Sequence, residues 1–346
     1  MTHPREVLLG AQASGTLLPV CDHYSGVEVR MRKSLQLQAE MTAEFGACVF
    51  DASLDCEDGA PVGGEHDHAQ MVVALANEAV AAALQAGSAI TPRIAVRVHP
   101  VDHPAFEADV ATIVGGAAQS LCHVMIPKVE SVADVARATA AVDAAARSAG
   151  RYAPLPLQVL LESPAAVHHA FDIAAHPRVQ SISFGLMDFV SAHAGAIPDS
   201  AMGTHLKAGS SELGQFSHPL VLRAKLEIAS ACHAHGKVPS HCVVTEFSDV
   251  AIMQAAARKA VREFGFTRMW SIHPSQIRPI LEALAPSDAD IARAAEIILA
   301  AVTAHWAPVS YAGQLHDRAS YRYYWQVLER AHQTGRHLPD AMRVYF

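Results

Sequence analysis

The chain has 346 residues, of which 51% are hydrophobic and 17% charged, and its formal net charge is −8 at pH 7. This is the composition of a folded globular protein, and a negative charge without clustered Lys and Arg argues against binding of nucleic acid. The six cysteines form no Cys-x-x-Cys pair, so neither a zinc ribbon nor a disulfide framework is indicated. No signal peptide or membrane-spanning stretch is evident, so we expect a cytoplasmic protein without membrane contact.

Short runs rich in Val, Ile and Leu alternate along the chain with longer, Ala-rich amphipathic stretches. Such alternation is typical of buried parallel strands joined by helices. The predicted strands cover residues 16–20, 47–54, 93–98, 123–127, 157–161, 181–185, 237–240 and 267–272. The predicted helices cover residues 33–45, 70–85, 106–118, 131–148, 165–174, 219–235 and 247–264. Eight strands with crossover helices predict an α/β fold, a (β/α)8 TIM barrel.

Two other segments complete the predicted domain organisation. A barrel catalytic domain is expected over residues 10–285, and a C-terminal helical extension over residues 286–346, packing on a neighbouring subunit. The link over residues 188–218 is rich in Gly, Ser, His and Pro and has no strong helical period, so we expect a lid there.

Acidic residues follow several of the predicted strands, at the rim where barrel enzymes build their sites. Glu57 and Asp58 follow the second strand, Glu162 the fifth and Asp188 the sixth. A carboxylate at the end of an apolar strand is costly to desolvate without a cation, and Mg²⁺ takes one or two protein carboxylates. Glu162 and Asp188 are therefore the predicted metal ligands, with Mg²⁺ as the cofactor and Mn²⁺ as an alternative. Taken singly, each acid is better explained as a helix cap or an ion-pair partner.

Three cationic or imidazole side chains lie at the same predicted rim. Arg97 is expected to bind a substrate carboxylate or an enolate oxygen, although an ion pair with Glu57 or Asp58 explains it equally well. Lys128 is a candidate substrate-binding residue, and a Schiff-base role ranks lower because neighbouring carboxylates keep its ammonium charged. His273 is a candidate for substrate binding, with a structural hydrogen-bonded role equally open.

Six ordered motifs resemble the citrate lyase β-subunit-like branch of the HpcH/HpaI aldolase family. They are LDCEDGAP at residues 54–61, RVH at 97–99, IPKVES at 126–131, LLESP at 160–164, FGLMD at 184–188 and IHPSQ at 272–276. The resemblance covers about two thirds of the chain. It implies a homo-oligomeric barrel enzyme, a trimer or a hexamer, that acts as a carbon–carbon lyase on malyl-, citramalyl- or citryl-like CoA thioesters.

The resemblance also implies roles for individual residues. Glu162 and Asp188 would bind Mg²⁺, Arg97 would bind substrate or stabilise an enolate, and Glu57 and Asp58 would support Arg97 and metal-bound water. By the same likeness, Asp317 in the extension is a candidate base delivered across a subunit boundary.

The sequence departs from the family where the handle for CoA is expected. The family leads from the first strand into a Pro-Gly turn with basic residues, whereas residues 19–26 read PVCDHYSG, and His99 replaces an expected Asn. A metal-dependent aldolase on a free 2-oxo or hydroxy acid is therefore the alternative function. A catalytically silent barrel is a third possibility, against which the retained acids argue.

Overall fold

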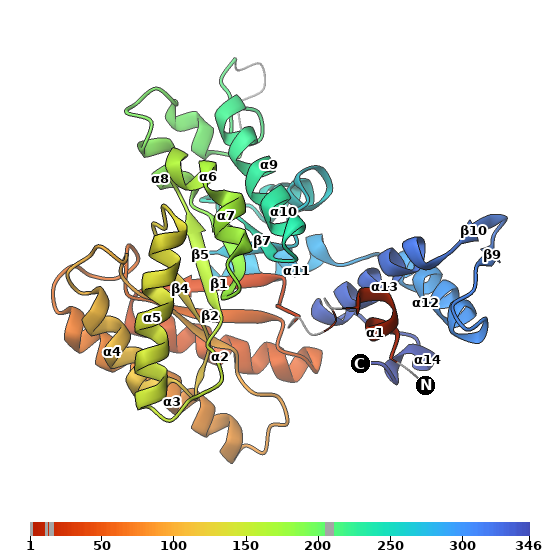
Figure 1. Ribbon diagram of the computed structural model, residues 1–346, viewed down its shortest axis with the longest axis horizontal. Coiled ribbons are helices and arrows are strands. Elements are labelled where there is room, and N and C mark those ends of the chain that lie inside the picture. The colour runs from red at the N-terminus through yellow and green to blue at the C-terminus, as the bar shows by residue number, and fades with distance from the viewer. Residues whose placement is uncertain (1–2, 11–12, 14–16, 205–210) are drawn as a thin grey trace.

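The computed structural model describes residues 3–10, 13, 17–204 and 211–346, and Figure 1 shows a barrel with an extension at one side. Eight parallel strands close the barrel in sequence order. They are β1 (Cys21–Ser25), β2 (Phe50–Asp55), β3 (Ile94–Arg97), β4 (Leu121–Ile126), β5 (Leu157–Leu161), β6 (Val179–Phe184), β7 (Val238–His241) and β8 (Arg268–Ser271). The predicted (β/α)8 barrel is confirmed.

The barrel helices form the outer layer and bury their apolar faces against the strands. They are α2 (Glu28–Phe45), α3 (Glu65–Gln85), α4 (Phe106–Ala117), α5 (Val132–Ser148), α6 (Pro164–His168), α7 (Ala170–Ala175), α8 (Leu186–Ser191), α9 (Pro219–Ala234), α10 (Val250–Phe264) and α11 (Ile277–Leu284). Local signals fix several starts: the Ser131 amide donates to Asp134 at α5, and Ser163 Oγ accepts from the Ala166 amide at α6. α5 and α6 therefore begin close to the ends of β4 and β5, the strands that precede them.

The first strand lies five residues later than predicted. The expected strand covered residues 16–20, of which Thr16 is outside the described residues, whereas β1 is Cys21–Ser25. Its residues Asp22 and His23 are fully buried despite being polar, which hid the strand from a search for apolar runs. The turn after the strand consequently begins at Gly26, whose added Cβ would lie 1.8 Å from the carbonyl oxygen of Gly59.

A buried layer of charge fills the barrel interior near β1, β2 and β8. The Asp51 carboxylate accepts from Arg93 Nε at 2.5 Å and from Arg268 Nη2 at 2.6 Å, and the same Arg268 nitrogen is 3.1 Å from Asp22. Because both acids are paired with guanidinium groups, the layer is electrostatically satisfied. It explains how polar residues occupy the inside of a closed barrel.

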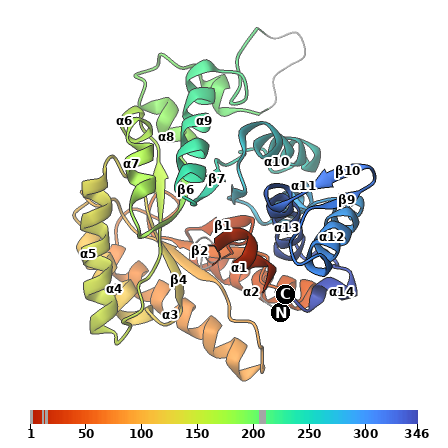
Figure 2. The ribbon, with the colours of Figure 1, turned by 45° about the vertical axis from the view of Figure 1, so that its right-hand side comes forward.

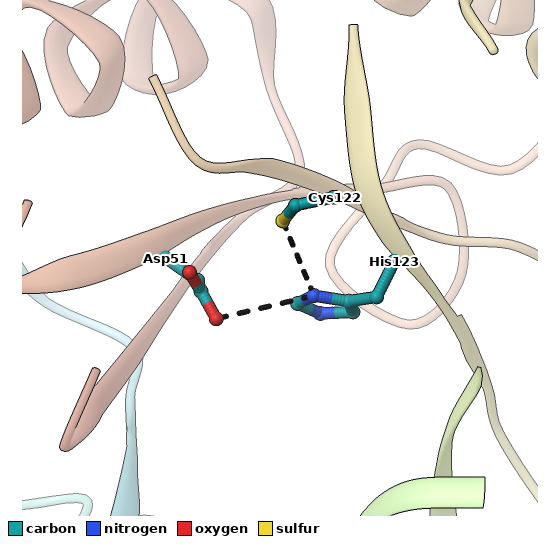
Figure 3. Close-up of side chains that lie close together, drawn as sticks. All are labelled: Asp51, Cys122 and His123. Atoms are coloured by element: carbon teal, nitrogen blue, oxygen red, sulfur yellow. Dashed lines mark hydrogen bonds and ion pairs between the residues drawn. The ribbon is translucent and has the colours of Figure 1, made fainter. Parts of the chain in front are cut away.

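Asp51 also lies beside Cys122 and His123, a set of potential metal-ligand types shown in Figure 3. His123 Nδ1 is 3.9 Å from Asp51 Oδ2 and 3.3 Å from Cys122 Sγ. Burial raises the pKa of the Cys122 thiol, and the two guanidinium groups already neutralise Asp51. We therefore interpret this cluster as part of the buried layer and not as a metal site.

The link predicted as a lid contains two short helical segments in its described part. α8 runs over Leu186–Ser191 and a 3-10 turn over Asp199–Met202. Residues 205–210 of the predicted lid lie outside the described residues. Closure of this segment over the barrel stays a prediction.

The extension gathers segments from both ends of the chain around an apolar cluster of its own. It contains α1 (Pro4–Leu9), α12 (Asp288–Thr303), α13 (Arg318–Gln333), α14 (Asp340–Arg343) and a hairpin of β9 (Val309–Tyr311) and β10 (Gln314–His316). Figure 1 shows α1 among α12, α13 and α14 beside the barrel, and Figure 2 shows the same grouping from another side. Trp325 and Tyr321 are fully buried in this cluster, so it has its own core. None of the described helices is long and apolar enough to cross a membrane.

Candidate active site

A cavity of about 790 Å³ opens at the carboxyl ends of the barrel strands. Its lining comes from the ends of β1, β2, β3, β5 and β8 and from the segments that follow β6 and β7. This is the end at which (β/α)8 enzymes place their sites. Among the predicted site residues, the cavity is lined by Arg97, Asp58, Glu162, Asp188 and His273.

Arg97 is held by two carboxylates. Its Nε and Nη2 donate to the two oxygens of Asp55 at 2.7 and 2.6 Å, and its Nη1 lies 3.0 Å from Glu57 Oε2. Burial alone would lower the pKa of Arg97, but these carboxylates outweigh it and raise the pKa above its usual value. The guanidinium is thus a fixed, fully charged group at the cavity wall.

Two aromatic rings fix the plane of the same guanidinium. The Arg97 Cζ atom lies 5.6 Å from the ring centre of Tyr24 and 5.5 Å from that of Trp270. The Tyr24 hydroxyl donates to Asp22 Oδ2 at 3.0 Å, which anchors the ring to the buried charged layer. Cation–π contact and bidentate pairing together leave Arg97 little rotational freedom.

Lys128, which follows β4, links the acids that follow β2 with the acid that follows β5. Its ammonium contacts Glu57 and lies 3.2 Å from Asp58 Oδ2, and its main-chain amide donates to Glu162 Oε1 at 2.7 Å. Burial would lower the pKa of Lys128, yet Glu57 and Asp58 raise it above its usual value. A charged ammonium of this kind is a poor nucleophile, which disfavours a Schiff-base role.

Glu162 and Asp188 face the same cavity from β5 and α8. Glu162 is only 5% exposed, and burial followed by the charge of Asp188 raises its pKa well above the usual value. Close approach is possible because residue 185 is glycine: an added Cβ there would lie 2.5 Å from Glu162 Oε2. A buried carboxylate whose pKa is raised by burial and by a second carboxylate beside it is suited to bind a hard divalent cation.

The remaining predicted residues have different surroundings. His273 lines the cavity, stacks on Phe247 with ring centres 4.8 Å apart, and accepts from the Ser275 amide at 3.2 Å. Glu57 lies behind the cavity wall between Arg97 and Lys128. Both the structural and the substrate-facing interpretations of His273 therefore keep support.

The structure does not bring Asp317 to this cavity within one chain. Asp317 precedes α13 in the extension, where its Oδ1 accepts from the Ala319 amide at 3.0 Å, and it lines a separate cavity with Trp306. Of the described residues, those that line the large cavity all belong to the barrel. A catalytic role for Asp317 requires another copy of the chain.

Several site residues were not predicted from the sequence. Asp55 stands directly opposite Arg97 in the β2–β3 pairing, a relationship that only the strand register reveals. Arg30 and Lys33 line the cavity from α2, and they were missed because the first strand was placed too early. Two cations therefore follow the first strand and line the cavity, which the predicted position of that strand did not reveal. Tyr24 and Trp270 gave no recognisable pattern in the sequence.

A family model described as HpcH/HpaI aldolase/citrate lyase matches residues 37–274. The chain belongs to the HpcH/HpaI aldolase/citrate lyase family. This confirms the membership expected from the six motifs and, with it, the enzyme class of carbon–carbon lyases.

Individual relatives within the HpcH/HpaI family include both lyases and lyase-like proteins. An L-malyl-CoA/beta-methylmalyl-CoA lyase of Cereibacter sphaeroides is 36% identical over 234 residues, which cover 66% of this chain and 72% of the relative. A citrate lyase subunit beta-like protein of Deinococcus radiodurans is 29% identical over 289 residues, which cover 81% of this chain and 89% of the relative.

Solved structures of other proteins resemble the fold of this HpcH/HpaI family member. A citrate lyase of Burkholderia xenovorans LB400 is 46% identical, covers 100% of both chains and superposes with a TM-score of 0.78. A Mycobacterium tuberculosis CitE protein, solved with magnesium, acetoacetate and coenzyme A, is 21% identical with a TM-score of 0.61. It covers 91% of this chain and 98% of its own. At that identity the likeness supports the fold alone.

Proposed function

We propose that the protein is a Mg²⁺-dependent lyase that cleaves or forms the carbon–carbon bond of a β-hydroxyacyl-CoA through an enolate. The observation that carries the proposal is the convergence of Glu162, Asp188 and Arg97 on one cavity. Two acids and one fixed cation match a substrate with a carboxylate, a hydroxyl and a developing enolate charge. Malyl-, citramalyl- and citryl-like thioesters have these three groups.

Glu162 and Asp188 would hold the metal. The raised pKa of Glu162 means that the metal-free pair resists full ionisation, and a divalent cation relieves that penalty. When bound, Mg²⁺ supplies Lewis-acid polarisation of substrate oxygens. The Lys128 amide would orient Glu162 for this role through its 2.7 Å hydrogen bond.

Arg97 would stabilise the enolate. In the cleavage direction the substrate hydroxyl loses its proton to a base and becomes the carbonyl of a 2-oxo acid. The carbon–carbon bond breaks, and its electron pair passes to the thioester enolate, which then takes up a proton. The guanidinium of Arg97 is pre-positioned by Asp55 and needs no reorganisation to meet that negative charge.

The base is proposed to come from another subunit. Asp317 is exposed in the extension, away from the cavity of its own chain, so it can act only if the extension reaches a neighbouring barrel. A homo-oligomer with shared sites follows from this proposal, and the family resemblance implies a trimer or a hexamer. The carboxylate of Asp317 would remove the hydroxyl proton in cleavage and return it in condensation.

The basic rim favours a thioester over a free acid. Arg30 and Lys33 are exposed on α2 where it lines the cavity, at a suitable place for the phosphates of CoA. A free hydroxy acid has no group that would extend to this rim. The alternative, a metal-dependent aldolase on a free 2-oxo or hydroxy acid, would leave these two cations unused.

Parallel assays with thioesters and free acids distinguish the two proposed functions. The purified protein with Mg²⁺ is incubated with malyl-, citramalyl- and citryl-CoA and, in parallel, with malate, citramalate and citrate, and the 2-oxo acid released is measured. Cleavage of at least one thioester and none of the free acids is expected. Cleavage of a free acid with no thioester turned over would establish the alternative instead.

A further inference from the structure

A second cavity, of about 350 Å³, lies at the opposite end of the barrel, where the barrel meets the extension. Its walls include Lys237 and Thr267, which immediately precede β7 and β8, and residues of α13. Since it borders the amino ends of the strands, it is separated from the proposed active site by the length of the barrel. We call it the junction cavity.

The junction cavity has an excess of positive charge. Arg5, Lys237, Arg322 and Arg330 line it with a single carboxylate, Glu329. The whole chain has 26 Lys and Arg against 34 Asp and Glu, so a cavity with four cations and one acid reverses the charge balance of the molecule. Such a concentration in a hollow attracts anions.

Glu329 is already committed to other partners. It forms an ion pair with Arg5, and its Oε1 accepts from Trp325 Nε1 at 2.7 Å. Lys237 and Arg330 instead donate to carbonyl oxygens, Lys237 to His176 at 3.2 Å and Arg330 to Thr267 at 2.6 Å. Among the described residues, neither of these two cations pairs with a carboxylate within 4.0 Å.

Both cations are half-buried, which makes the missing counter-charge costly. Burial lowers the pKa of Arg330 to about 10 and lowers the pKa of Lys237 from its usual value. An anion in the cavity would remove this penalty. The guanidinium fork suits a tetrahedral oxyanion, which it can bind with two parallel hydrogen bonds.

We infer that the junction cavity is a binding site for a phosphate dianion, free or as the terminal group of a small phosphate ester. Lys237 belongs to the barrel and Arg330 to the extension, so one anion would contact both units. Binding would therefore strengthen the attachment of the extension to the barrel. This inference is independent of the proposed function, because its site is at the other end of the barrel.

Titration calorimetry with inorganic phosphate on the full chain, in a buffer free of phosphate and other oxyanions, tests the site. Arg330→Met and Lys237→Met are expected to weaken phosphate binding by about tenfold or more each. Arg258→Met, on the exposed face of α10, is the matched control and should bind phosphate as the parent does. Lys33→Met, at the rim of the large cavity, tests the other basic site of the molecule. Phosphate binding at the junction cavity should persist in Lys33→Met. Loss of binding in Lys33→Met with retention in Arg330→Met would place the phosphate in the large cavity and overturn the inference.

Thermal unfolding of the unaltered protein gives a second readout that needs no variant. Phosphate should raise Tm progressively, relative to chloride at matched ionic strength, because it binds the folded state. Glycerol phosphate and inorganic phosphate are compared to distinguish an ester from the free ion. The absence of any heat and any Tm shift up to about 10 mM of both ligands would contradict the inference.

Discussion

The main-chain amide of Lys128 donates a 2.7 Å hydrogen bond to Glu162 Oε1. Lys128 adopts a left-handed backbone conformation, with φ of 50°, which is uncommon outside glycine. Its amide thereby points to one acid while its side chain reaches Glu57 and Asp58. One strained residue thus holds together the proposed metal ligand and the carboxylates around Arg97.

Removal of either proposed metal ligand should reduce metal binding. Glu162→Gln and Asp188→Asn are expected to lower Mg²⁺ or Mn²⁺ affinity by about tenfold or more, because each deletes a charged oxygen ligand. Calorimetric titration of metal-free protein measures this, with Asp172→Asn on the exposed surface of α7 as the control. Unchanged affinity in both variants would refute the assignment.

A methyl group at residue 185 should displace Glu162. The added Cβ of Gly185→Ala would lie 2.5 Å from both Cβ and Oε2 of Glu162, so we expect weaker metal binding and a loss of about 1–3 kcal/mol in stability. Gly115→Ala is the matched control, since nothing lies within 4 Å of its added Cβ. Chemical denaturation and metal titration of both variants provide the comparison. Equal behaviour of the two variants would show that the position of Glu162 is unimportant.

Arg97→Lys should separate catalysis from metal binding. Lysine keeps the positive charge but loses the bidentate pairing with Asp55 and the stacking between Tyr24 and Trp270. We expect kcat to fall by about 100-fold or more while the metal affinity stays close to that of the parent. Steady-state kinetics on the thioester identified in the parallel substrate assays measure this decrease in kcat. Retention of kcat would mean that Arg97 does not meet the enolate.

Subunit complementation tests the role of Asp317. Asp317→Asn retains the helix-capping ability of the side chain, because Asn caps about as well as Asp, so the loss of activity should occur without loss of stability. Inactive Asp317→Asn and inactive Glu162→Gln protein, mixed under conditions that exchange subunits, should regain activity in hybrid sites. Full activity of Asp317→Asn alone would exclude it as the base.

Stability should depend on pH through a buried lysine outside the site. Lys225 is fully buried, donates to Gln215 Oε1 at 2.9 Å, and burial lowers its pKa to about 8. Between pH 8 and 10.5 the unfolded chain holds this proton and the folded chain releases it, so the penalty is largest below pH 8 and fades as pH rises.

Lys225→Met should therefore be more stable than the parent at neutral pH, by up to about 3 kcal/mol. The difference should shrink as pH approaches 10.5. Urea denaturation of both proteins at several pH values measures it. A difference that grows with pH would mean that the sign of this pKa shift is wrong.

Much of the barrel was predictable because most of its strands are apolar runs followed by amphipathic helices. The exception was β1, in which Asp22 and His23 are buried. Asp22 is compatible with the barrel interior because Arg268 lies 3.1 Å away, and Arg268 is contributed by the last strand of the barrel. A local pattern has no access to a partner so distant in the sequence.

The same limit explains what was missed in the site. Strand ends indicated Glu162, Asp188 and Arg97, and the structure places all three on one cavity. Prediction of Asp55 as a partner of Arg97 required the pairing of β2 with β3. Prediction of Lys33 as a cavity residue required the correct position of the end of β1. The cavity at which Asp317 would act belongs to a neighbouring subunit. Neither the local sequence nor the structure of one chain shows how subunits assemble.

The packing of α1 against α13 makes the extension a discontinuous unit, closed by the ion pair of Arg5 with Glu329. Because α1 precedes the barrel in the sequence and α13 follows it, the ribosome must synthesise the whole barrel before these two helices can pack together. Since domains fold as units during synthesis, the barrel is expected to form first and the extension last. Under the proposed function, each newly made chain would complete its own cavity before it could offer Asp317 to a neighbour, so activity would appear only after assembly.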